Sequence, residues 1–264
     1  MPRVPRIKPR HSRRLLLVQL LPNLVTIGAI CAGLTSVRFV LADRFGMAVA
    51  LIVLAAILDG LDGPLARMLK SESAIGAELD SLADFLNFGV APGVFLYIWA
   101  LDEARNFGWI AVLVYAVCSV LRLARFNVSA REGGADGEID LLDDDPPSKK
   151  DVFTGVPSPG GALLALLPFT LSHSLGNVTL PPEMIAVWLI VVGLLMISQI
   201  PTPSFKSMRV EREMVRYLMV GLVAFVAIAF TWPWIVLSCV QFLYLAIIAV
   251  VAYRARGERG SDGT

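Results

Sequence analysis

Long apolar runs recur along the chain, and short polar segments separate them. A helix needs about 20 apolar residues to cross the hydrocarbon core of a membrane, and about eight stretches approach that length. They are residues 18–41, 46–66, 78–100, 108–128, 154–173, 184–202, 215–231 and 233–253. The pattern therefore predicts an all-α integral membrane protein with about eight transmembrane helices. The last two stretches meet at Trp232-Pro233, and the sequence leaves open whether they are separate spans.

Composition agrees with a membrane protein. Of the 264 residues, 56% are hydrophobic and only 17% are charged, whereas charged residues make up about a quarter of an ordinary soluble domain. The mean hydropathy is +0.69. The net charge of +1 gives no reason to expect a nucleic-acid partner, because such partners select strongly basic surfaces.

Basic residues are distributed unevenly between the two sides of the predicted spans. With the N-terminus in the cytoplasm, 20 of the 23 lysines and arginines fall on the cytoplasmic side, and only Arg38, Arg44 and Arg105 fall outside. Because Lys and Arg accumulate in cytoplasmic loops, this imbalance predicts that both termini lie in the cytoplasm. The stretch 132–151 is rich in Asp, Gly and Pro. It is expected to form an acidic cytoplasmic loop that extends over residues 131–152.

Four aspartates interrupt the apolar pattern around the second and third spans. Asp59 and Asp62 lie three residues apart, and Asp80 and Asp84 lie four apart, so each pair shares one face of a helix. The polar segment 70–76 between them ends in a glycine and is expected to turn the chain at the membrane surface. The two pairs would then converge. Carboxylates held together near lipid are costly without a counter-charge.

A divalent cation would supply that counter-charge. Coordination by carboxylates alone suits Mg²⁺, Mn²⁺ or Ca²⁺, whereas zinc usually recruits His or Cys. One ion or, as in many phosphoryl-transfer enzymes, two would leave coordination positions for phosphate oxygens. Gly63 and Ala66 remove bulk beside the acids, and Arg67 offers donors to a phosphate or a base. A cation transporter is the alternative from another class, but its acids would be expected at mid-membrane.

The spacing D-x2-D-G-x2-A-R-x8-G-x3-D-x3-D is met by Asp59, Asp62, Gly63, Ala66, Arg67, Gly76, Asp80 and Asp84. It resembles the signature of the CDP-alcohol phosphotransferase family, membrane enzymes that move a phosphoryl-linked group from a CDP-activated donor to an alcohol. The resemblance implies a six-helix core, a cytoplasm-facing active site and a homodimer. It divides the chain into a basic arm (1–14), the core (15–206), two additional C-terminal helices (207–253) and a cytoplasmic tail (254–264).

The resemblance also assigns site residues. It implies that the four aspartates bind the metal ions and that Asp84 is the general base that accepts the acceptor's hydroxyl proton. Asn23 and Thr26 share one face of the first span and are expected to contact the nucleotide, or alternatively to form hydrogen bonds between helices. The expected CDP-binding residues are Asn23, Thr26, Asp59, Asp62, Gly63, Ala66, Arg67 and Gly76.

Further segments resemble the phosphatidylserine synthase branch of the family, which uses CDP-diacylglycerol and L-serine. They are LPNLVTIGAICAG (21–33), LDSLADFLNFGVAP (79–92), LRLARFN (121–127), GVPSPGG (155–161) and ISQIPTPSFK (197–206). The branch implies phosphatidyl transfer to serine with release of CMP. Other acceptors, namely glycerol phosphate, inositol phosphate or choline, stay open.

Basic residues near the ends of two predicted spans suit the acceptor or the lipid phosphate. Arg122 and Arg125 can each grip a carboxylate or phosphate with two donors, and Asn127 can accept from an ammonium group. Lys206, after the sixth span, is a candidate for the lipid phosphate. The alternative for all the basic side chains is simple anchoring of helices on the cytoplasmic side.

Overall fold

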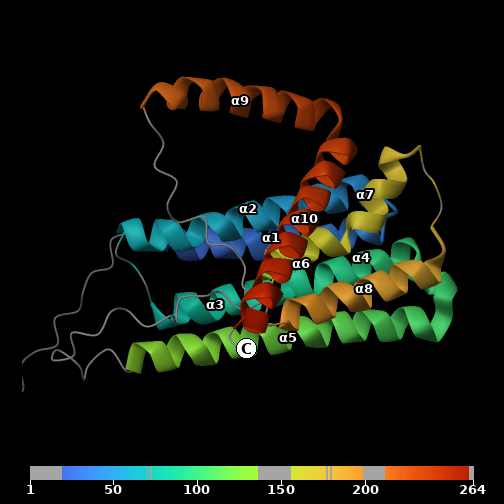
Figure 1. Ribbon diagram of the computed structural model, residues 1–264, viewed down its shortest axis with the longest axis horizontal. Coiled ribbons are helices and arrows are strands. Elements are labelled where there is room, and N and C mark those ends of the chain that lie inside the picture. Colours follow the sequence, from blue (N-terminus) through green and yellow to red (C-terminus); the bar gives the residue numbers. More distant parts are fainter. Residues whose placement is uncertain are drawn as a thin grey trace, which may run out of the picture.

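A computed structural model describes residues 20–69, 71, 73–135, 156–176, 178, 180–198 and 212–261 (Figure 1). All regular structure in these ranges is helical. The elements in chain order are α1 (Leu21–Val40), α2 (Phe45–Leu69), α3 (Ala74–Asp84), the π-helix η2 (Phe85–Val90), α4 (Ala91–Trp99), the 3-10 helix η3 (Leu101–Ala104), α5 (Arg105–Ala135), α6 (Ser158–Ala165), α7 (Leu167–Ser174), α8 (Pro182–Ile197), α9 (Arg212–Thr231) and α10 (Pro233–Ser261).

Five helical segments are long and apolar enough to cross a membrane. They are Leu21–Val40, Phe45–Leu69, Ile75–Trp99, Leu101–Val128 and Pro233–Tyr253. The third runs through α3, η2 and α4, which follow one another without a break, and α8 is a shorter apolar helix. The prediction of an all-α integral membrane protein is confirmed, while the count of eight spans stays a prediction.

The helices form a bundle that α10 crosses obliquely (Figure 1). Within the bundle, α1 packs against α2, and α5 packs against both α8 and η2. Helix α9 lies apart from the bundle and packs against α10, beyond a bend at Trp232. The last two predicted spans are therefore separate helices. Pro233 favours this break, because proline has no N–H to donate to a carbonyl of the preceding turn.

Some predicted boundaries were wrong. The end predicted at residue 128 for the fourth membrane span agrees with the span Leu101–Val128. Helix α5 itself continues to Ala135, so the acidic loop predicted from residue 131 begins too early. The stretch predicted over 154–173 is divided into α6 and α7. Residues 136–152 of the predicted loop, the basic arm 1–14 and Lys206 lie outside the described residues.

Proline accounts for the break between α6 and α7. Pro168 has no N–H, so the carbonyl of Leu164 loses its helical donor. The indole Nε1 of Trp188 in α8 donates to that carbonyl at 2.8 Å. One residue earlier, Nε2 of Gln241 in α10 donates to the carbonyl of Leu163 at 2.7 Å. Because an unpaired carbonyl is costly in lipid, α8 and α10 stabilise the break, and α10 is part of the folded bundle.

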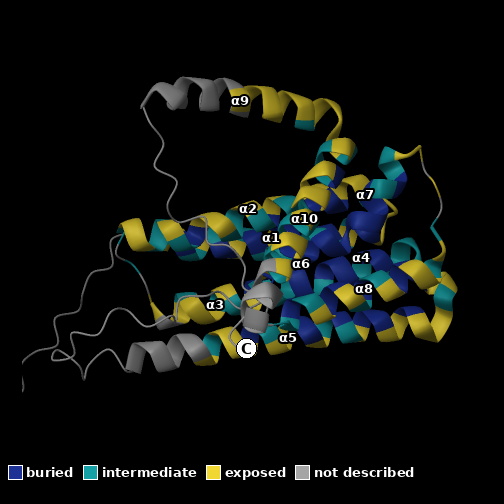
Figure 2. Ribbon diagram, in the orientation of Figure 1, coloured by how far each residue is buried: buried dark blue, intermediate teal, exposed yellow. Residues whose placement is uncertain are grey.

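The buried core is built by side chains of α2, α4, α5, α6 and α8, with further buried residues from α7 and α10 (Figure 2). Phe169 of α7 is fully buried and packs edge-to-face on Phe95, Trp99 and Trp234, with ring centroids 4.9, 5.1 and 5.4 Å away. Aromatic pairs in this geometry add to the free energy of burial. Trp234 belongs to α10, which therefore also contributes to the apolar core.

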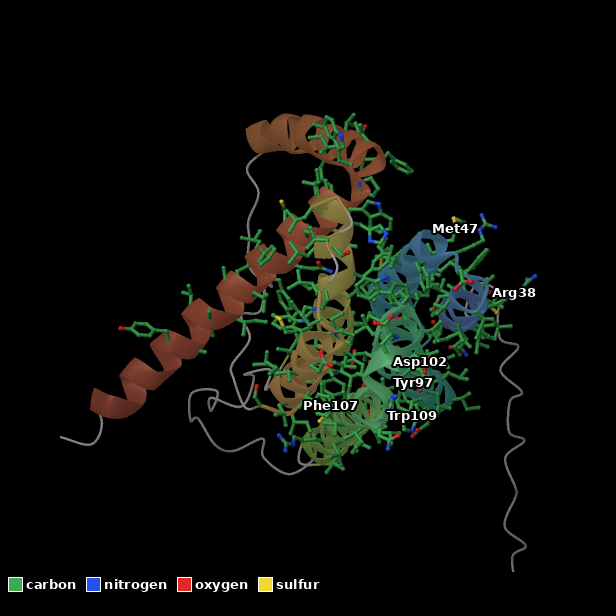
Figure 3. All side chains as sticks on the ribbon, turned by 90° about the vertical axis from the view of Figure 1, so that its right-hand side faces the viewer. Arg38, Met47, Tyr97, Asp102, Phe107 and Trp109 are labelled. Carbon is green, nitrogen blue, oxygen red and sulfur yellow. The ribbon has the colours of Figure 1, made fainter. Side chains whose placement is uncertain are left out.

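One end of the bundle is rimmed by aromatic and charged side chains. Figure 3 shows Arg38, Tyr97, Asp102 and Trp109 at the end where α1 leads into α2 and η3 leads into α5. Tyr97 and Trp109 lie edge-to-face with centroids 5.2 Å apart. Tyr and Trp are typical of the membrane–water boundary. The predicted site residues lie toward the opposite ends of α2 and α5.

Candidate active site

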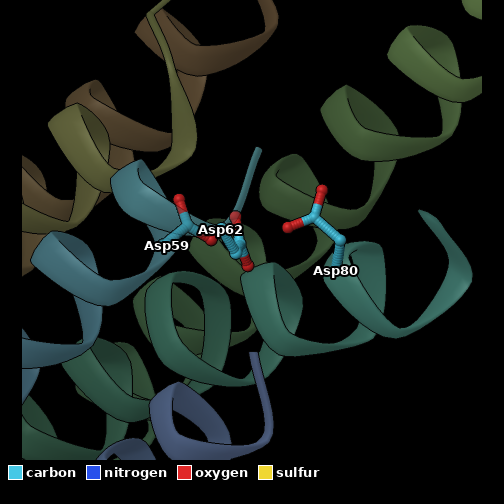
Figure 4. A group of neighbouring side chains, drawn as sticks. All are labelled: Asp59, Asp62 and Asp80. Atoms are coloured by element: carbon cyan, nitrogen blue, oxygen red, sulfur yellow. The ribbon is translucent and has the colours of Figure 1, made fainter. Parts of the chain in front are cut away.

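Three of the four predicted aspartates converge. Asp59 and Asp62 of α2 and Asp80 of α3 each place one carboxylate oxygen within 4.8 Å of the others (Figure 4). Asp62 is buried, Asp59 is partly buried and Asp80 is exposed. The three-residue spacing puts the first two on one face of α2, and α3 brings the third from the next helix. Three carboxylates from two helices are a suitable donor set for a hard divalent cation.

The turn between α2 and α3 differs in one detail from the prediction. Gly76 was expected to break the helix, but α3 already begins at Ala74. Ser73 ends the turn instead, because its side-chain oxygen accepts from the N–H of Gly76 at 3.0 Å, the usual arrangement of a serine N-cap.

Gly76 is needed for space. A Cβ atom there would lie 3.0 Å from Oδ1 of Asn23 and 3.1 Å from Oγ of Ser73. Both distances are shorter than ordinary van der Waals contact. The absence of a side chain lets the first turn of α3 approach α1 closely.

Asp84 ends α3 and lies outside the 4.8 Å group. Its carboxyl shares a hydrogen bond with that of Asp59 and interacts electrostatically with Asp80 and Arg122. Its Oδ1 atom is buried and has no hydrogen-bond partner. Leaving a buried acceptor unpaired costs free energy, so this oxygen is available to bind a cation or to accept a proton from a substrate.

Asp62 is oriented by α1. Oγ1 of Thr26 donates to Oδ2 of Asp62 at 2.7 Å, in a buried setting. The same hydroxyl lies 3.1 Å from the carbonyl of Pro22, but its single proton serves the shorter contact. Of the two expectations for Thr26, the hydrogen bond between helices is the one that the structure shows. Such a contact fixes a carboxylate that would otherwise rotate.

A cleft of about 280 Å³ opens between α1, α2 and α3. Its lining consists of Pro22, Asn23, Thr26, Asp62, Gly63, Ala66, Arg67, Ser71, Ser73, Gly76, Ala77 and Asp80. All the residues predicted to bind CDP, apart from Asp59, line this one cleft. Sequence reasoning did not single out Ser71 and Ser73, although the polar composition of segment 70–76 pointed to that turn.

The predicted acceptor residues separate into different environments. Arg122 donates from Nη1 to Oγ of Ser158 and interacts electrostatically with Asp84 and Asp59. Arg125 is exposed, and its Nη1 donates to the carbonyl of Ile197 at the end of α8, at 3.3 Å. Arg122 therefore faces the aspartates, whereas Arg125 caps a helix.

Asn127 is also engaged within the protein. Its Nδ2 donates to Oγ of Ser81 at 3.0 Å, which joins α5 to α3 directly beside Asp80. Oδ1 of Asn127 also lies 3.3 Å from Oγ of Ser81. These contacts position α3, and binding of an ammonium group by Asn127 stays a prediction.

Sequence reasoning missed two residues that the fold brings to Arg122. Ser158 begins α6, and Tyr244 lies in α10, more than a hundred residues after the aspartates. Tyr244 interacts electrostatically with Arg122. Its position within an apolar run marks it only as a membrane residue, so no sequence signal could have placed it here.

Fold and site together define a helical membrane protein with a carboxylate-rich centre beside a cleft. Residues 19–198 match the family model described as CDP-alcohol phosphatidyltransferase, and the chain belongs to that family. The curated protein from Mycobacterium leprae named CDP-diacylglycerol–serine O-phosphatidyltransferase is 40% identical over 253 residues, covering 94% of this chain and 79% of the relative.

Relatives outside the mycobacteria have the same name. The protein from Helicobacter pylori is 34% identical, over 86% of this chain and 88% of its own length. The protein from Bacillus subtilis is 33% identical, over 72% of this chain and 94% of its own length. The similarity thus reaches well beyond the aspartate signature.

Proposed function

We propose that this protein transfers the phosphatidyl group from CDP-diacylglycerol to the hydroxyl of L-serine, giving phosphatidylserine and CMP. The observation that carries the proposal is the position of Asp59, Asp62 and Asp80 at a cleft lined by the other residues of the family signature. The names of the relatives indicate the donor and the acceptor. The polar site within helices of a membrane protein suits a donor that is itself a lipid.

The aspartates would hold one or two divalent metal ions, Mg²⁺ or Mn²⁺ and less typically Ca²⁺. Asp59, Asp62 and Asp80 fit such an ion by donor type and by their mutual approach within 4.8 Å. Asp84, whose carboxyl interacts electrostatically with Asp62 and Asp80, is a fourth available carboxylate. A bound ion would supply charge neutralisation and polarisation of the pyrophosphate.

The chain's own residues would bind and orient the donor. Gly63 and Ala66 leave room for the nucleotide in the cleft, and the guanidinium of Arg67 can pair with its phosphate. Asn23 faces the same cleft from α1 and offers an amide to the nucleotide. These contacts hold the pyrophosphate beside the carboxylates, so that the phosphorus on the diacylglycerol side is exposed to the acceptor.

Asp84 would act as the general base. As the serine oxygen forms a bond to that phosphorus, the bond from phosphorus to the bridging pyrophosphate oxygen breaks, and CMP leaves with the electron pair. The serine hydroxyl proton passes to Asp84, whose Oδ1 is buried and accepts no hydrogen bond from another described residue. A positioned base of this kind typically contributes about 10²–10⁴-fold to the rate.

The same proposal includes the arrangement in the membrane. Six spans would form the family core, with α9 and α10 as the two additional C-terminal helices, and both termini and the site would face the cytoplasm. Lys206 would lie on that side, near lipid phosphates. Two copies of the chain would form a homodimer, as the family resemblance implies.

Release of CMP by the purified protein from CDP-diacylglycerol, measured over a panel of alcohols, tests the function. Turnover should require both a divalent cation and L-serine. Glycerol phosphate, inositol phosphate and choline should give little product. Turnover with one of those alcohols and none with serine would reject the acceptor assignment, and cation flux without nucleotide consumption would favour a transporter.

A further inference from the structure

Arg122 and two side chains that interact with it each have a buried polar atom without a hydrogen-bond partner. The atoms are Nε of Arg122, Oδ1 of Asp84 and Oη of Tyr244. Arg122 interacts electrostatically with both of the other side chains. Buried polar groups are nearly always paired, and each unpaired group costs free energy. Three of them, connected through Arg122, indicate a place for a polar ligand.

Each of the three atoms comes from a different helix. Arg122 belongs to α5, Asp84 ends α3, and Tyr244 lies in the middle of α10. The phenol of Tyr244 lies over the first turn of α6, because a Cβ atom at Gly160 would come within 2.6 Å of its Oη. Two residues earlier in that turn, Ser158 accepts a hydrogen bond from Arg122. The hydroxyl of Tyr244 and the guanidinium of Arg122 therefore both lie beside the first turn of α6.

The chemistry of the three atoms is complementary to serine. Nε of Arg122 and Oη of Tyr244 are donors, and Oδ1 of Asp84 is an acceptor. A carboxylate has two oxygens and would accept from both donors, while a nearby hydroxyl of the same molecule would donate to Asp84. L-Serine has both groups, since its carboxylate is attached to Cα and its hydroxyl to the adjacent Cβ. Choline has no anionic group with which to pair the two donors.

We propose that Tyr244 is a specificity residue for the acceptor, and that its hydroxyl donates to the serine carboxylate that Arg122 also binds. The inference rests on the proposed function. It extends that function to a helix outside the region matched by the family model, which ends at residue 198. Helix α10 thus does more than complete the bundle, because it closes the acceptor side of the site.

Tyr244→Phe tests the role of the hydroxyl alone. The variant keeps the ring that packs on Gly160 and removes one hydrogen bond to a charged group. Loss of such a bond weakens binding by about tenfold or more, so the KM for L-serine should rise by about that factor. The KM for CDP-diacylglycerol and the kcat at saturating serine should stay within about twofold. Tyr253→Phe is the matched control, because Tyr253 lies on the same helix with 82% of its surface exposed.

The possible outcomes are distinct. An unchanged serine KM in Tyr244→Phe would overturn the inference while leaving the proposed function intact. A fall in kcat alone, or an equal rise in both Michaelis constants with a lower thermal midpoint, would indicate a purely structural tyrosine and would also overturn it. If the wild-type protein does not release CMP with serine, the proposed function fails first, and the inference fails with it.

Discussion

Asp62 is the aspartate whose surroundings are best defined. It is buried, its carboxylate belongs to the group with Asp59 and Asp80, and Thr26 donates to it at 2.7 Å. A buried carboxylate without that donor would have more rotational freedom and a less favourable orientation toward a cation. The hydroxyl of Thr26 therefore contributes to the site without needing to touch a substrate.

Thr26→Val should weaken metal activation. The variant has nearly the same shape but lacks the donor, and loss of a group that orients a metal ligand typically reduces affinity about 10- to 100-fold. The concentration of Mn²⁺ giving half-maximal CMP release should rise within that range, and Thr26→Ser should restore most of the loss. Thr35→Val is the matched control, because Thr35 lies on the same helix, is only partly buried and donates to the carbonyl of Cys31 instead of to an aspartate. Equal activation curves for Thr26→Val and the wild type would contradict this role.

For single residues, the sequence predicted well which aspartates converge, and less well which side chains bond to which partners. Asp59, Asp62 and Asp80 were predictable, because helical spacing and one polar turn suffice to bring them together. Arg125 and Asn127 looked equally available for serine, and only the fold shows that they bond to Ile197 and Ser81. Such pairings depend on which helices pack together, which a residue pattern does not specify.

Among the elements, α1 and α3 both line the cleft. The missing side chain of Gly76 determines how closely these two helices approach each other. A methyl group at this position would press on Asn23, and relief of such overpacking typically costs about 1–3 kcal/mol. Because Asn23 lines the cleft, its displacement should narrow the space for the nucleotide.

Gly76→Ala should consequently raise the KM for CDP-diacylglycerol about fivefold or more, while the KM for serine changes little. Stability should fall by less than this overpacking cost, because alanine favours the helix over glycine by about 1 kcal/mol. Gly28→Ala is the control, since a Cβ atom there would meet only ordinary contact with Leu58 at 3.8 Å. If both variants behave alike, the close approach of α1 and α3 has no bearing on donor binding.

The break between α6 and α7 gives a second prediction at the scale of the elements. Trp188→Phe removes the donor to the carbonyl of Leu164 and keeps an aromatic ring, so it should destabilise the protein by about 1–3 kcal/mol. The thermal unfolding midpoint in detergent should fall, with activity retained at low temperature. Trp109→Phe should leave the midpoint unchanged, because Trp109 is 45% exposed at the rim. A midpoint equal to that of the wild type would mean that the carbonyl needs no donor.

Element boundaries show what a pattern of apolar residues cannot resolve. Composition alone predicted one span over 154–173, and the break arises because Pro168 removes a donor while Trp188 and Gln241 replace it from other helices. The loop start at residue 131 was wrong for the opposite reason, since α5 remains helical through polar residues to Ala135, beyond the end of the membrane span at Val128. Apolar length predicts that a segment is helical, but not where the helix ends.

For the whole molecule, the distribution of basic residues predicts that the site faces the cytoplasm. In a variant with Cys31, Cys118 and Cys239 replaced by alanine, a single Asp102→Cys should react with a membrane-impermeant maleimide in intact cells. A single Ser73→Cys should react only after permeabilisation, because Ser73 is exposed in the turn between α2 and α3 and lines the cleft. The reverse pattern of labelling would place the aspartates on the outer side and would refute the orientation.

The central claim is that serine becomes part of a lipid at the aspartate site, with Asp84 as the base. The most direct measurement follows labelled L-serine and CDP-diacylglycerol in liposomes that contain the purified protein, and counts labelled lipid and CMP in the same sample. We predict one labelled lipid for each CMP, a loss of both by about 100-fold or more in Asp84→Asn, and unchanged rates in the Asp102→Asn control at the far end of the bundle. Wild-type rates in Asp84→Asn, or CMP release that does not depend on serine, would contradict the account.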